Sequence, residues 1–277
     1  MVLKSFSKIN LTLSVNNKLK NGLHEIQSYF CLINLSDKIK INKIKKKKDE
    51  IIFQGPFAKN VKTNNSIVNL LKLLRKLKLI SNYYAVHVVK NIPVFSGLGG
   101  GTSNAAFILQ FLLKGNISKN IINKIEKVVG SDLSLFFFSQ GFLENLKSIK
   151  VTQKKYKLFF LLSRPIINCS TREIYSKVKK YSKKNKFSSY KVNTKKKFIK
   201  HILAQKNELQ SIVEKKHPKI KSLITDIGAE KGCYFSRMSG SGSVCYGLFS
   251  SENNAKKALN KIKIKYPKFW FSTAKTV

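Results

Sequence analysis

The glycine-rich segment between a predicted strand and a predicted helix is the strongest constraint on how this chain folds. Four of the five residues Gly97–Gly101 are glycines, in the sequence PVFSGLGGGTSNAA. An alternating apolar pattern over Ala85–Val89 predicts the strand, and a helical apolar pattern over Thr102–Leu113 predicts the helix. Glycines leave the backbone N–H groups uncovered where the helix starts, and the positive end of a helix binds anions. Because Thr102 and Ser103 add hydroxyl groups, the segment predicts a phosphate-binding loop.

This loop differs from the two commonest phosphate-binding motifs. It lacks the lysine of the GxxxxGK[ST] loop, and its glycines do not follow the GxGxxG spacing of dinucleotide-binding proteins. The alternative interpretation is a flexible turn without a ligand. The strand and helix predicted on either side favour the phosphate-binding interpretation.

The N-terminal half of the chain predicts a sheet together with helices. Ser66–Leu79 has apolar residues at helical spacing, and either Asn65 or Ser66 is a suitable N-cap. A further helix is predicted at Ile117–Val129. Strands are predicted at Phe6–Val15, Tyr29–Leu35, Lys38–Ile44 and Ile51–Phe53, the last two as a hairpin, and strand-like apolar runs at Leu133–Phe138 and Leu158–Leu162.

The C-terminal half continues this mixture. Ser170 and Glu173 form a capping box, which predicts a helix to about Lys180. The lysine-rich residues 181–200 are expected to start as an exposed, mobile segment. Helices are predicted from Ile212, at Ile220–Gly228 and at Ala255–Ile262, and strands at Cys233–Met238, Val244–Phe249 and Phe269–Ala274. The composition changes near residues 147–157, which predicts two domains, 1–150 and 151–277, in an α+β fold.

The net charge of +41, from 54 Lys and Arg residues against 13 Asp and Glu residues, favours anionic partners. Lysines are spread over most of the chain, with denser runs at Lys43–Lys48 and Lys195–Lys197. A solvated lysine surface is therefore expected, and a nucleic-acid-binding protein remains the alternative from a different functional class. No specific nucleic acid is expected as a partner.

The remaining composition indicates a soluble cytoplasmic protein. No stretch reaches the length of apolar sequence that a membrane span needs, and the first residues resemble a strand rather than a secretory signal. The four cysteines have no CxxC spacing and do not cluster with the histidines, so reduced thiols are expected, without a zinc site.

Four segments, in order along nearly the whole chain, resemble the motifs of the GHMP small-molecule kinases. The first segment is SKINLTLSV together with GLHEIQS. The other three are GLGGGTSNAA, GSDLSLFF and MSGSGSVCYGLF. The resemblance implies a two-domain α+β architecture with mixed sheets, an active site between the domains, and ATP and Mg²⁺ as cofactors. The GLHEIQS segment and the triple glycine resemble the branch that phosphorylates the 2-hydroxyl of a cytidine diphosphate-linked methylerythritol, in isoprenoid biosynthesis. A monomer or a homodimer is expected.

The same resemblance assigns the site residues. It implies Lys8 and Asp132 as the catalytic pair, Asn10, His24, Thr171 and Tyr175 as substrate-binding residues, and no protein residue as a metal ligand. It implies that ATP is bound by Pro93, Val94, Phe95, Ser96, Gly97, Leu98, Gly99, Gly100, Gly101, Thr102 and Ser103.

These roles suit phosphoryl transfer, which needs a group that accepts or orients the hydroxyl proton and positive charge near the migrating group. Asp132 would accept the proton, and the charge of Lys8 would favour its ionised carboxylate. From the residues alone, Asp132 is equally a turn aspartate, and His24 an ordinary turn histidine. The resemblance has three departures: Leu23 stands where an aromatic residue is usual, Ser134 where a proline is usual, and Glu144 alone remains of a glycine–glutamate pair.

Two questions stay open at this level. The MSGSGS segment, residues 238–243, is either a second glycine turn that completes the substrate or phosphate pocket, or an ordinary hairpin turn. A kinase of the same superfamily that acts on a different small alcohol is the second alternative for the function.

Overall fold

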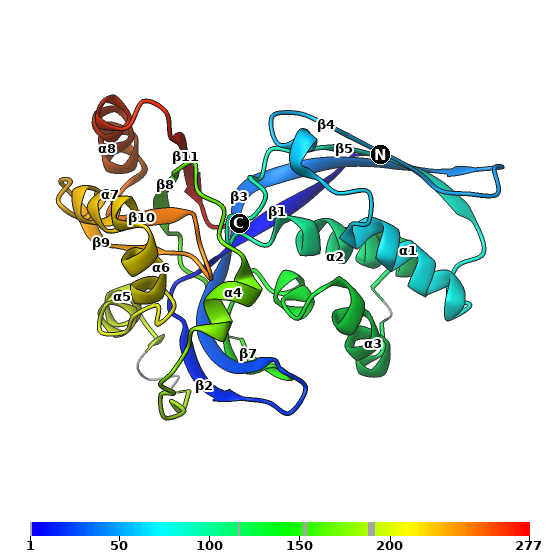
Figure 1. Ribbon diagram of the computed structural model, residues 1–277, viewed down its shortest axis with the longest axis horizontal. Coiled ribbons are helices and arrows are strands. Elements are labelled where there is room, and N and C mark those ends of the chain that lie inside the picture. The colour runs from blue at the N-terminus through cyan, green and yellow to red at the C-terminus, as the bar shows by residue number, and fades with distance from the viewer. Residues whose placement is uncertain (1, 116, 152–153, 188–191) are drawn as a thin grey trace. The chain divides into compact units, whose positions relative to one another are not determined.

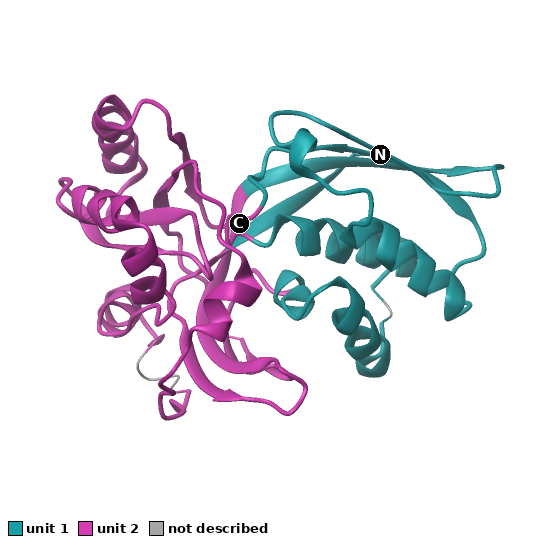
Figure 2. Ribbon diagram, viewed as in Figure 1, with its two compact units in different colours: residues 1–8, 35–94, 99–137 teal, residues 9–34, 95–98, 138–277 magenta. Residues whose placement is uncertain are grey.

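The computed structural model describes residues 2–115, 117–151, 154–187 and 192–277, which divide into two compact units (Figure 2). Unit 1 comprises residues 1–8, 35–94 and 99–137, and unit 2 comprises residues 9–34, 95–98 and 138–277. Both units are therefore discontinuous in sequence. The two predicted domains, 1–150 and 151–277, stay a prediction; the compact units change between Phe137 and Phe138.

The elements in or entering unit 1 are β1 (Val2–Asn10), β3 (His24–Ile44), β4 (Glu50–Gln54), η1 (Ala58–Asn60), α1 (Ser66–Lys76), β5 (Tyr83–Val89), α2 (Gly100–Leu113), α3 (Lys119–Val129) and η2 (Leu133–Phe137). Those of unit 2 are β2 (Ser14–Lys18), β6 (Gln140–Asn145), β7 (Ser148–Lys150), β8 (Phe159–Arg164), α4 (Thr171–Ser176), α5 (Lys195–Leu203), α6 (Gln210–Lys216), α7 (Pro218–Gly228), β9 (Cys233–Met238), β10 (Cys245–Phe249), α8 (Glu252–Lys265) and β11 (Trp270–Lys275). The mixed sheets with helices confirm the predicted α+β class.

The sheet of unit 1 has β5 between β3 and β4. The β3–β5 pair is antiparallel and the β4–β5 pair is parallel. The predicted hairpin of Lys38–Ile44 with Ile51–Phe53 is therefore wrong. The charged turn after Ile44 does not fold β4 back onto β3; instead β5, which returns from helix α1, pairs with both strands. Helices α1 and α2 cover one face of these strands (Figure 1).

Helix α1 confirms the N-cap prediction. The side chain of Asn65 accepts hydrogen bonds from the N–H groups of Ile67 and Val68, which satisfies two of the free donors at the helix start. The apolar positions Ile67, Leu70, Leu71 and Leu74 are all buried. A single face of the helix thus builds the core of unit 1, as the spacing predicts.

The four-stranded sheet of unit 2 has the antiparallel order β11-β8-β10-β9. The strands predicted at Leu158–Leu162, Cys233–Met238, Val244–Phe249 and Phe269–Ala274 are confirmed, with shifts of one or two residues at their ends. Helices α7 and α8 pack on this sheet, since both contact its strands (Figure 1).

Five further predicted segments differ from the structure. Tyr29–Leu35 and Lys38–Ile44 belong to one strand, β3, and the predicted strand Phe6–Val15 is interrupted between β1 and β2. The apolar run Leu133–Phe138 forms the 3-10 helix η2, because Gly130 and Asp132 accept turn hydrogen bonds from Leu133 and Leu135. Helix α4 ends at Ser176, short of Lys180.

The lysine-rich stretch 181–200 is only partly described. Residues 188–191 lie outside the described residues, and the prediction of a mobile segment is untested there. Helix α5 begins within the stretch at Lys195, where Thr194 accepts a hydrogen bond from the N–H of Lys197. The helix start was missed because Phe198 is the first apolar anchor.

Candidate active site

The N-terminus of α2 presents the predicted phosphate-binding amides. The helix starts at Gly100, two residues before the predicted start at Thr102, and Gly99 is its N-cap with a φ of 71°. The first turn therefore contains Gly100, Gly101 and Thr102, whose N–H groups have no earlier helical carbonyl to bind. The N–H of Ser103 closes the turn on the carbonyl of Gly99, at 2.8 Å. An anion at this helix end is stabilised by the free amides and the helix dipole.

Close packing explains why glycines occupy the start of this helix. A Cβ atom on Gly99 would lie 2.8 Å from the ring of Phe136 and 3.3 Å from Cε of Lys8. A Cβ atom on Gly100 would lie 2.9 Å from the side chain of Ile92. The glycines thus let the helix end approach the lysine and the 3-10 helix closely.

The predicted catalytic pair is formed within unit 1. Nζ of Lys8 lies 3.1 Å from Oδ2 of Asp132. The side chain of Lys8 is 4% exposed and that of Asp132 is 32% exposed. Lys8 is therefore buried beside Gly99, while the aspartate carboxylate reaches solvent next to it. The carboxylate of Asp132 can therefore accept a proton from a small molecule that reaches it from solvent.

Ser103 and Thr102, the two residues predicted to add hydroxyl groups to the phosphate-binding loop, have different surroundings. Ser103 is fully buried, and its hydroxyl donates to the carbonyl of Phe6 at 2.5 Å and lies 2.7 Å from Oγ of Ser5. Its side chain ties α2 to β1 and does not face the helix end. Thr102 is half-buried, and its Oγ1 lies 3.0 Å from the position of a Cβ on Gly130.

The segment that carries Asp132 is held by a neighbouring carboxylate. The hydroxyl of Ser134 in η2 donates to Oε1 of Glu126 in α3. Burial raises the pKa of Glu126, the two hydrogen bonds from Ser134 lower it, and the nearby charge of Asp132 raises it. Ser134 thus replaces the usual proline with a hydrogen bond that ties the aspartate-bearing turn to α3.

In unit 2, His24 and Tyr175, which the resemblance assigns to the substrate, lie together. Their ring centroids are 5.1 Å apart with an angle of 32° between the planes. Tyr181 adds a third ring, 6.3 Å from His24, and it is 44% exposed. Burial lowers the pKa of His24, and the charge of Lys18 lowers it further. The lowered pKa favours the neutral imidazole, which lies beside two aromatic rings that suit a flat heterocycle.

The other predicted substrate-binding residues lie around the MSGSGS turn. Oγ1 of Thr171 and Oγ of Ser241 are 2.9 Å apart. Asn10 is buried; its N–H donates to Oγ of Ser239 at 3.2 Å and its side chain donates to Oγ of Ser28 at 2.8 Å. Asn10 therefore holds the turn through its backbone, and its role in binding substrate stays a prediction.

The first part of the predicted ATP-binding stretch also contacts this turn. The carbonyl of Ser96 accepts the N–H of Val244 at 3.1 Å, and the carbonyl of Gly97 accepts Oγ of Ser239 at 3.3 Å. Leu98 and Pro93 are buried, Val94 is half-buried and Phe95 is exposed. Within unit 2, the turn thus supports the glycine loop and is more than a connection between two strands.

Sequence reasoning missed Tyr181 and Glu126. Tyr181 lies in a lysine-rich stretch that has no helical or strand pattern, so nothing in the sequence places it beside His24. Glu126 is one of several polar residues in a predicted helix. The sequence does place a carboxylate six residues before the proposed base, but this spacing indicates no particular contact until the fold is known.

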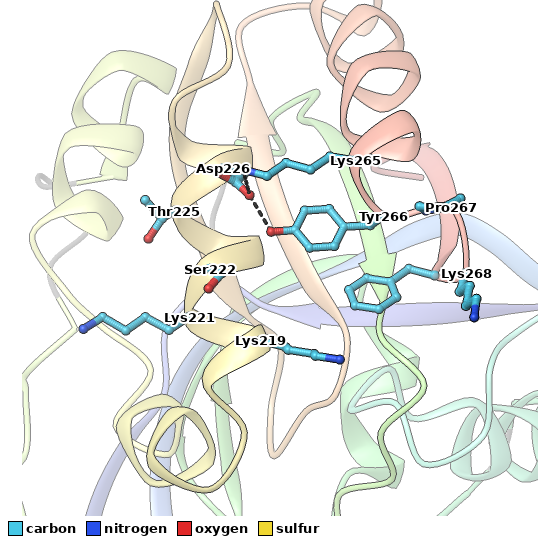
Figure 3. Close-up of a pocket in the computed structure, with 10 residues that line it drawn as sticks. Lys219, Lys221, Ser222, Thr225, Asp226, Lys265, Tyr266, Pro267 and Lys268 are labelled. Atoms are coloured by element: carbon cyan, nitrogen blue, oxygen red, sulfur yellow. Dashed lines mark hydrogen bonds and ion pairs between the residues drawn. The ribbon is translucent and has the colours of Figure 1, made fainter.

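A groove elsewhere in unit 2 contains none of the predicted site residues. It has a volume of about 760 Å³ and lies between α7 and the segment from the end of α8 to β11 (Figure 3). Asp226 accepts a hydrogen bond from the hydroxyl of Tyr266 at 2.5 Å and from Nζ of Lys265 at 2.8 Å. These contacts join the two helices, and the lysines at the rim point in different directions (Figure 3).

Comparison with known families and proteins agrees with these features. The family model of the GHMP kinases N terminal domain matches residues 65–139, and that of the GHMP kinases C terminal domain matches residues 196–268. Proteins named 4-diphosphocytidyl-2-C-methyl-D-erythritol kinase are similar over almost their full length. The protein from Pelagibacter ubique is 36% identical, with 99% of this chain and 98% of the relative covered, and that from Wolbachia pipientis is 34% identical, with 96% and 95% covered.

Solved structures share the fold. A crystal structure of 4-(cytidine 5'-diphospho)-2C-methyl-D-erythritol kinase matches with a TM-score of 0.74 at 21% identity, covering 99% of both chains. The mevalonate kinase of L. major matches with a TM-score of 0.69 at 14% identity, covering 99% of this chain and 95% of that one. The predicted GHMP-kinase-like architecture is confirmed.

Proposed function

Because this chain belongs to the GHMP kinase family, among the 4-diphosphocytidyl-2-C-methyl-D-erythritol kinases, we propose that it transfers a phosphoryl group from ATP to 4-diphosphocytidyl-2-C-methyl-D-erythritol. The acceptor is the 2-hydroxyl, and the products are the 2-phosphate and ADP. The reaction is a step of the non-mevalonate route to isoprenoid precursors.

The observation that carries this proposal is the position of the Lys8–Asp132 pair beside the N-cap of α2. A Cβ atom on Gly99 would lie 3.3 Å from Cε of Lys8, whose Nζ lies 3.1 Å from Oδ2 of Asp132. A proton acceptor and a buried cation therefore adjoin the helix end that suits phosphate. Phosphoryl transfer depends mainly on such positioning and on charge stabilisation.

Each residue has a distinct role in this proposal. The amides of Gly100, Gly101 and Thr102 hold phosphate oxygens of ATP. Asp132 accepts the proton of the attacking hydroxyl, and Lys8 orients the carboxylate and stabilises negative charge near the migrating group. His24 and Tyr175 hold the cytosine, because aromatic faces stack on nucleobases.

Mg²⁺ is part of the proposal as the ion that accompanies ATP. The described residues contain no group of three or more His, Cys, Asp or Glu side chains that would form a metal cage. Mg²⁺ in kinases usually needs only one or two carboxylates, together with phosphate oxygens and water. We therefore expect phosphate oxygens of ATP and water to supply most of the ligands of the ion. A bound Mg²⁺ would neutralise charge on the phosphate oxygens.

We propose that the protein acts in the cytoplasm on this small molecule, as a monomer or a homodimer. Among the helices of the described ranges, none is long and apolar enough to span a bilayer. The resemblance to cytidine-substrate kinases and the wide distribution of lysines support a small-molecule substrate rather than a specific nucleic acid.

The test is a coupled assay for ADP release with a panel of alcohols. The purified chain is incubated with ATP, Mg²⁺ and one acceptor at a time: 4-diphosphocytidyl-2-C-methyl-D-erythritol, homoserine, mevalonate or galactose. ADP should form rapidly with the cytidine compound alone. ADP release at the no-acceptor rate with that compound would refute the proposal, and preference for another acceptor would select a different kinase of the same fold.

A further inference from the structure

Glu126 holds its carboxylate in a position that costs stability. Of the four charged residues in α3, Lys119, Lys124 and Lys127 are exposed, whereas Glu126 is half-buried. Burial raises the pKa of Glu126, and the nearby charge of Asp132 raises it further. Ionisable groups in such surroundings are concentrated at functional sites. The position of Glu126 beside the proposed base therefore points to a use in the reaction.

Both donors of Ser134 bond to this carboxylate. The hydroxyl of Ser134 donates to Oε1 of Glu126, and the backbone N–H of Ser134 donates to the same side chain. The neighbouring N–H groups of Leu133 and Leu135 bond within the turn itself. Glu126 thus joins helix α3 to the start of η2 through a side chain that accepts two hydrogen bonds.

These bonds fix one of the two ends of the turn that carries Asp132. On the preceding side, Gly130 has a φ of 138°, and a Cβ atom there would lie 3.0 Å from Oγ1 of Thr102 in the first turn of α2. On the following side, Ser134 is held by Glu126. Asp132 therefore lies between a close backbone contact and a hydrogen-bonded anchor, all within unit 1.

The proposed base needs such an anchor. The side chain of Asp132 is 32% exposed, and its carboxylate pairs with Lys8 at 3.1 Å. A general base must lie within hydrogen-bond distance of the proton that it removes. A displacement of about 1 Å in a catalytic group can lower a rate by about 100-fold. A carboxylate that reaches solvent from a turn meets this requirement only if the backbone of the turn is fixed.

On the basis of the proposed kinase function, we propose that Glu126 is a positioning residue, which acts through Ser134 to hold the carboxylate of Asp132 where the acceptor hydroxyl arrives. In this role Glu126 contacts neither ATP nor the acceptor and takes no proton from the hydroxyl. Its loss therefore slows the transfer step and leaves the affinities for both substrates unchanged.

The test is the steady-state kinetics of Glu126→Ala with ATP, Mg²⁺ and the cytidine compound. The value of kcat should fall by about 10-fold to 100-fold, since the base is no longer fixed. The KM for the cytidine compound and the ADP dissociation constant, measured by calorimetry, should stay within about twofold, because the lost effect belongs to the transition state. Glu126→Gln still offers an oxygen to Ser134 and should restore kcat to within about threefold of the wild type.

Two further variants separate positioning from stability. Ser134→Ala removes the hydroxyl donor and should lower kcat at least about threefold; adding it to Glu126→Ala should cause no further fall, since both changes remove one contact. Ser118→Ala is the matched control, because Ser118 caps the same helix by accepting the N–H of Ile121. It should lower the thermal unfolding midpoint but leave kcat unchanged.

Several results would overturn the inference. These are an unchanged kcat in a folded Glu126→Ala protein, an equal loss of kcat in Ser118→Ala, and a higher Mg²⁺ requirement in Glu126→Ala, which would make Glu126 a ligand of the ion. If Glu126→Ala does not fold, an unchanged kcat in Ser134→Ala overturns it instead. A wild type that releases no ADP with the cytidine compound would refute the proposed function itself, together with this role.

Discussion

At the scale of single residues, the account depends on a lysine and an aspartate that the sequence alone does not distinguish. Lys8 is one of many lysines, and Asp132 follows a glycine as turn aspartates often do. The fold distinguishes them from the other lysines and aspartates, because it buries Lys8 beside Gly99 and leaves the carboxylate of Asp132 within reach of solvent. Their roles in catalysis stay predictions that substitution can test.

Asp132→Asn should abolish turnover while nucleotide binding persists. The amide has nearly the same size as the carboxylate but cannot accept the hydroxyl proton, so kcat should fall by roughly 100-fold or more. ADP affinity should change little. Steady-state kinetics and calorimetry check the two quantities separately. The matched control is Asp226→Asn, which removes a surface carboxylate paired with Lys265 and Tyr266 and should leave kcat unchanged. Near-wild-type kcat in Asp132→Asn would exclude the base role.

His24 should make substrate binding depend on pH only in the acidic range. Burial and the charge of Lys18 lower its pKa from 6.5, so the neutral ring predominates at and above pH 6.5. The binding contribution of the neutral ring is then fully present above that value and is lost as the pH falls through the lowered pKa. The KM for the cytidine substrate, measured between about pH 5 and 8, should rise only at the acidic end. The rise should be absent in His24→Gln, and a rise already complete at pH 6.5 would contradict this assignment.

At the scale of elements, local sequence patterns predict a helix or strand correctly when its formation depends on its own residues. The apolar spacing and N-cap of α1 depend on neighbouring residues only, and the prediction is confirmed. The hairpin of β3 with β4 was wrong because pairing depends on β5, which lies about 30 residues further along and inserts between them. The apolar run in η2 looked like a strand because buried 3-10 helices and buried strands have the same composition.

A buried ion pair anchors the strand that leads into the glycine loop. Lys90 follows β5, and its ammonium group bonds to Oδ2 of Asp37, with exposed fractions of 2% and 0% for the two side chains. Oδ1 of Asp37 accepts the N–H groups of Asn91 and Ile92, each at 2.8 Å. The pair thus fixes the backbone just before Pro93 and lies under the first residue of α2, since a Cβ on Gly100 would be 3.2 Å from Nζ of Lys90.

Lys90→Met should therefore lower the free energy of unfolding by about 3–5 kcal/mol, because it leaves the Asp37 carboxylate buried without its partner. Urea denaturation measures the change. The double variant Lys90→Met with Asp37→Asn should recover part of the loss, since an amide oxygen still accepts the two backbone N–H groups. Lys46→Met, which removes an exposed pair with Glu50, is the control and should cost less than about 1 kcal/mol. Equal losses in the two single variants would refute this role.

At the scale of the whole molecule, the order of the motifs along the chain predicts the family. The positions of their residues in the structure explain what each motif does. Gly99 of GLGGGTSNAA, Asp132 of GSDLSLFF and Lys8 of SKINLTLSV meet around one helix end in unit 1. The compact units were beyond sequence reasoning, because each is assembled from separate stretches and β1 and β3 contribute to both. The contact of Tyr181 with His24 is likewise long-range in sequence, and the lysine-rich sequence around Tyr181 does not indicate it.

The charge of +41 should produce nucleic-acid binding that is weak and dependent on salt. A diffuse lysine surface attracts phosphates by its field, and such binding weakens steeply as salt rises. A gel-shift titration with RNA should show association at low salt, loss of the complex near about 0.15 M salt, and no protected footprint. A complex that survives there with a defined footprint would favour the nucleic-acid-binding alternative.

The most direct measurement of the central claim is phosphorus NMR of the purified chain with ATP, Mg²⁺ and 4-diphosphocytidyl-2-C-methyl-D-erythritol. The account predicts a new phosphomonoester signal on the cytidine compound, coupled through the carbon at position 2, together with ADP in equal amount. The Asp132→Asn protein should give neither signal. Unchanged ATP with the wild type, or ATP converted only to ADP and inorganic phosphate, would contradict the account.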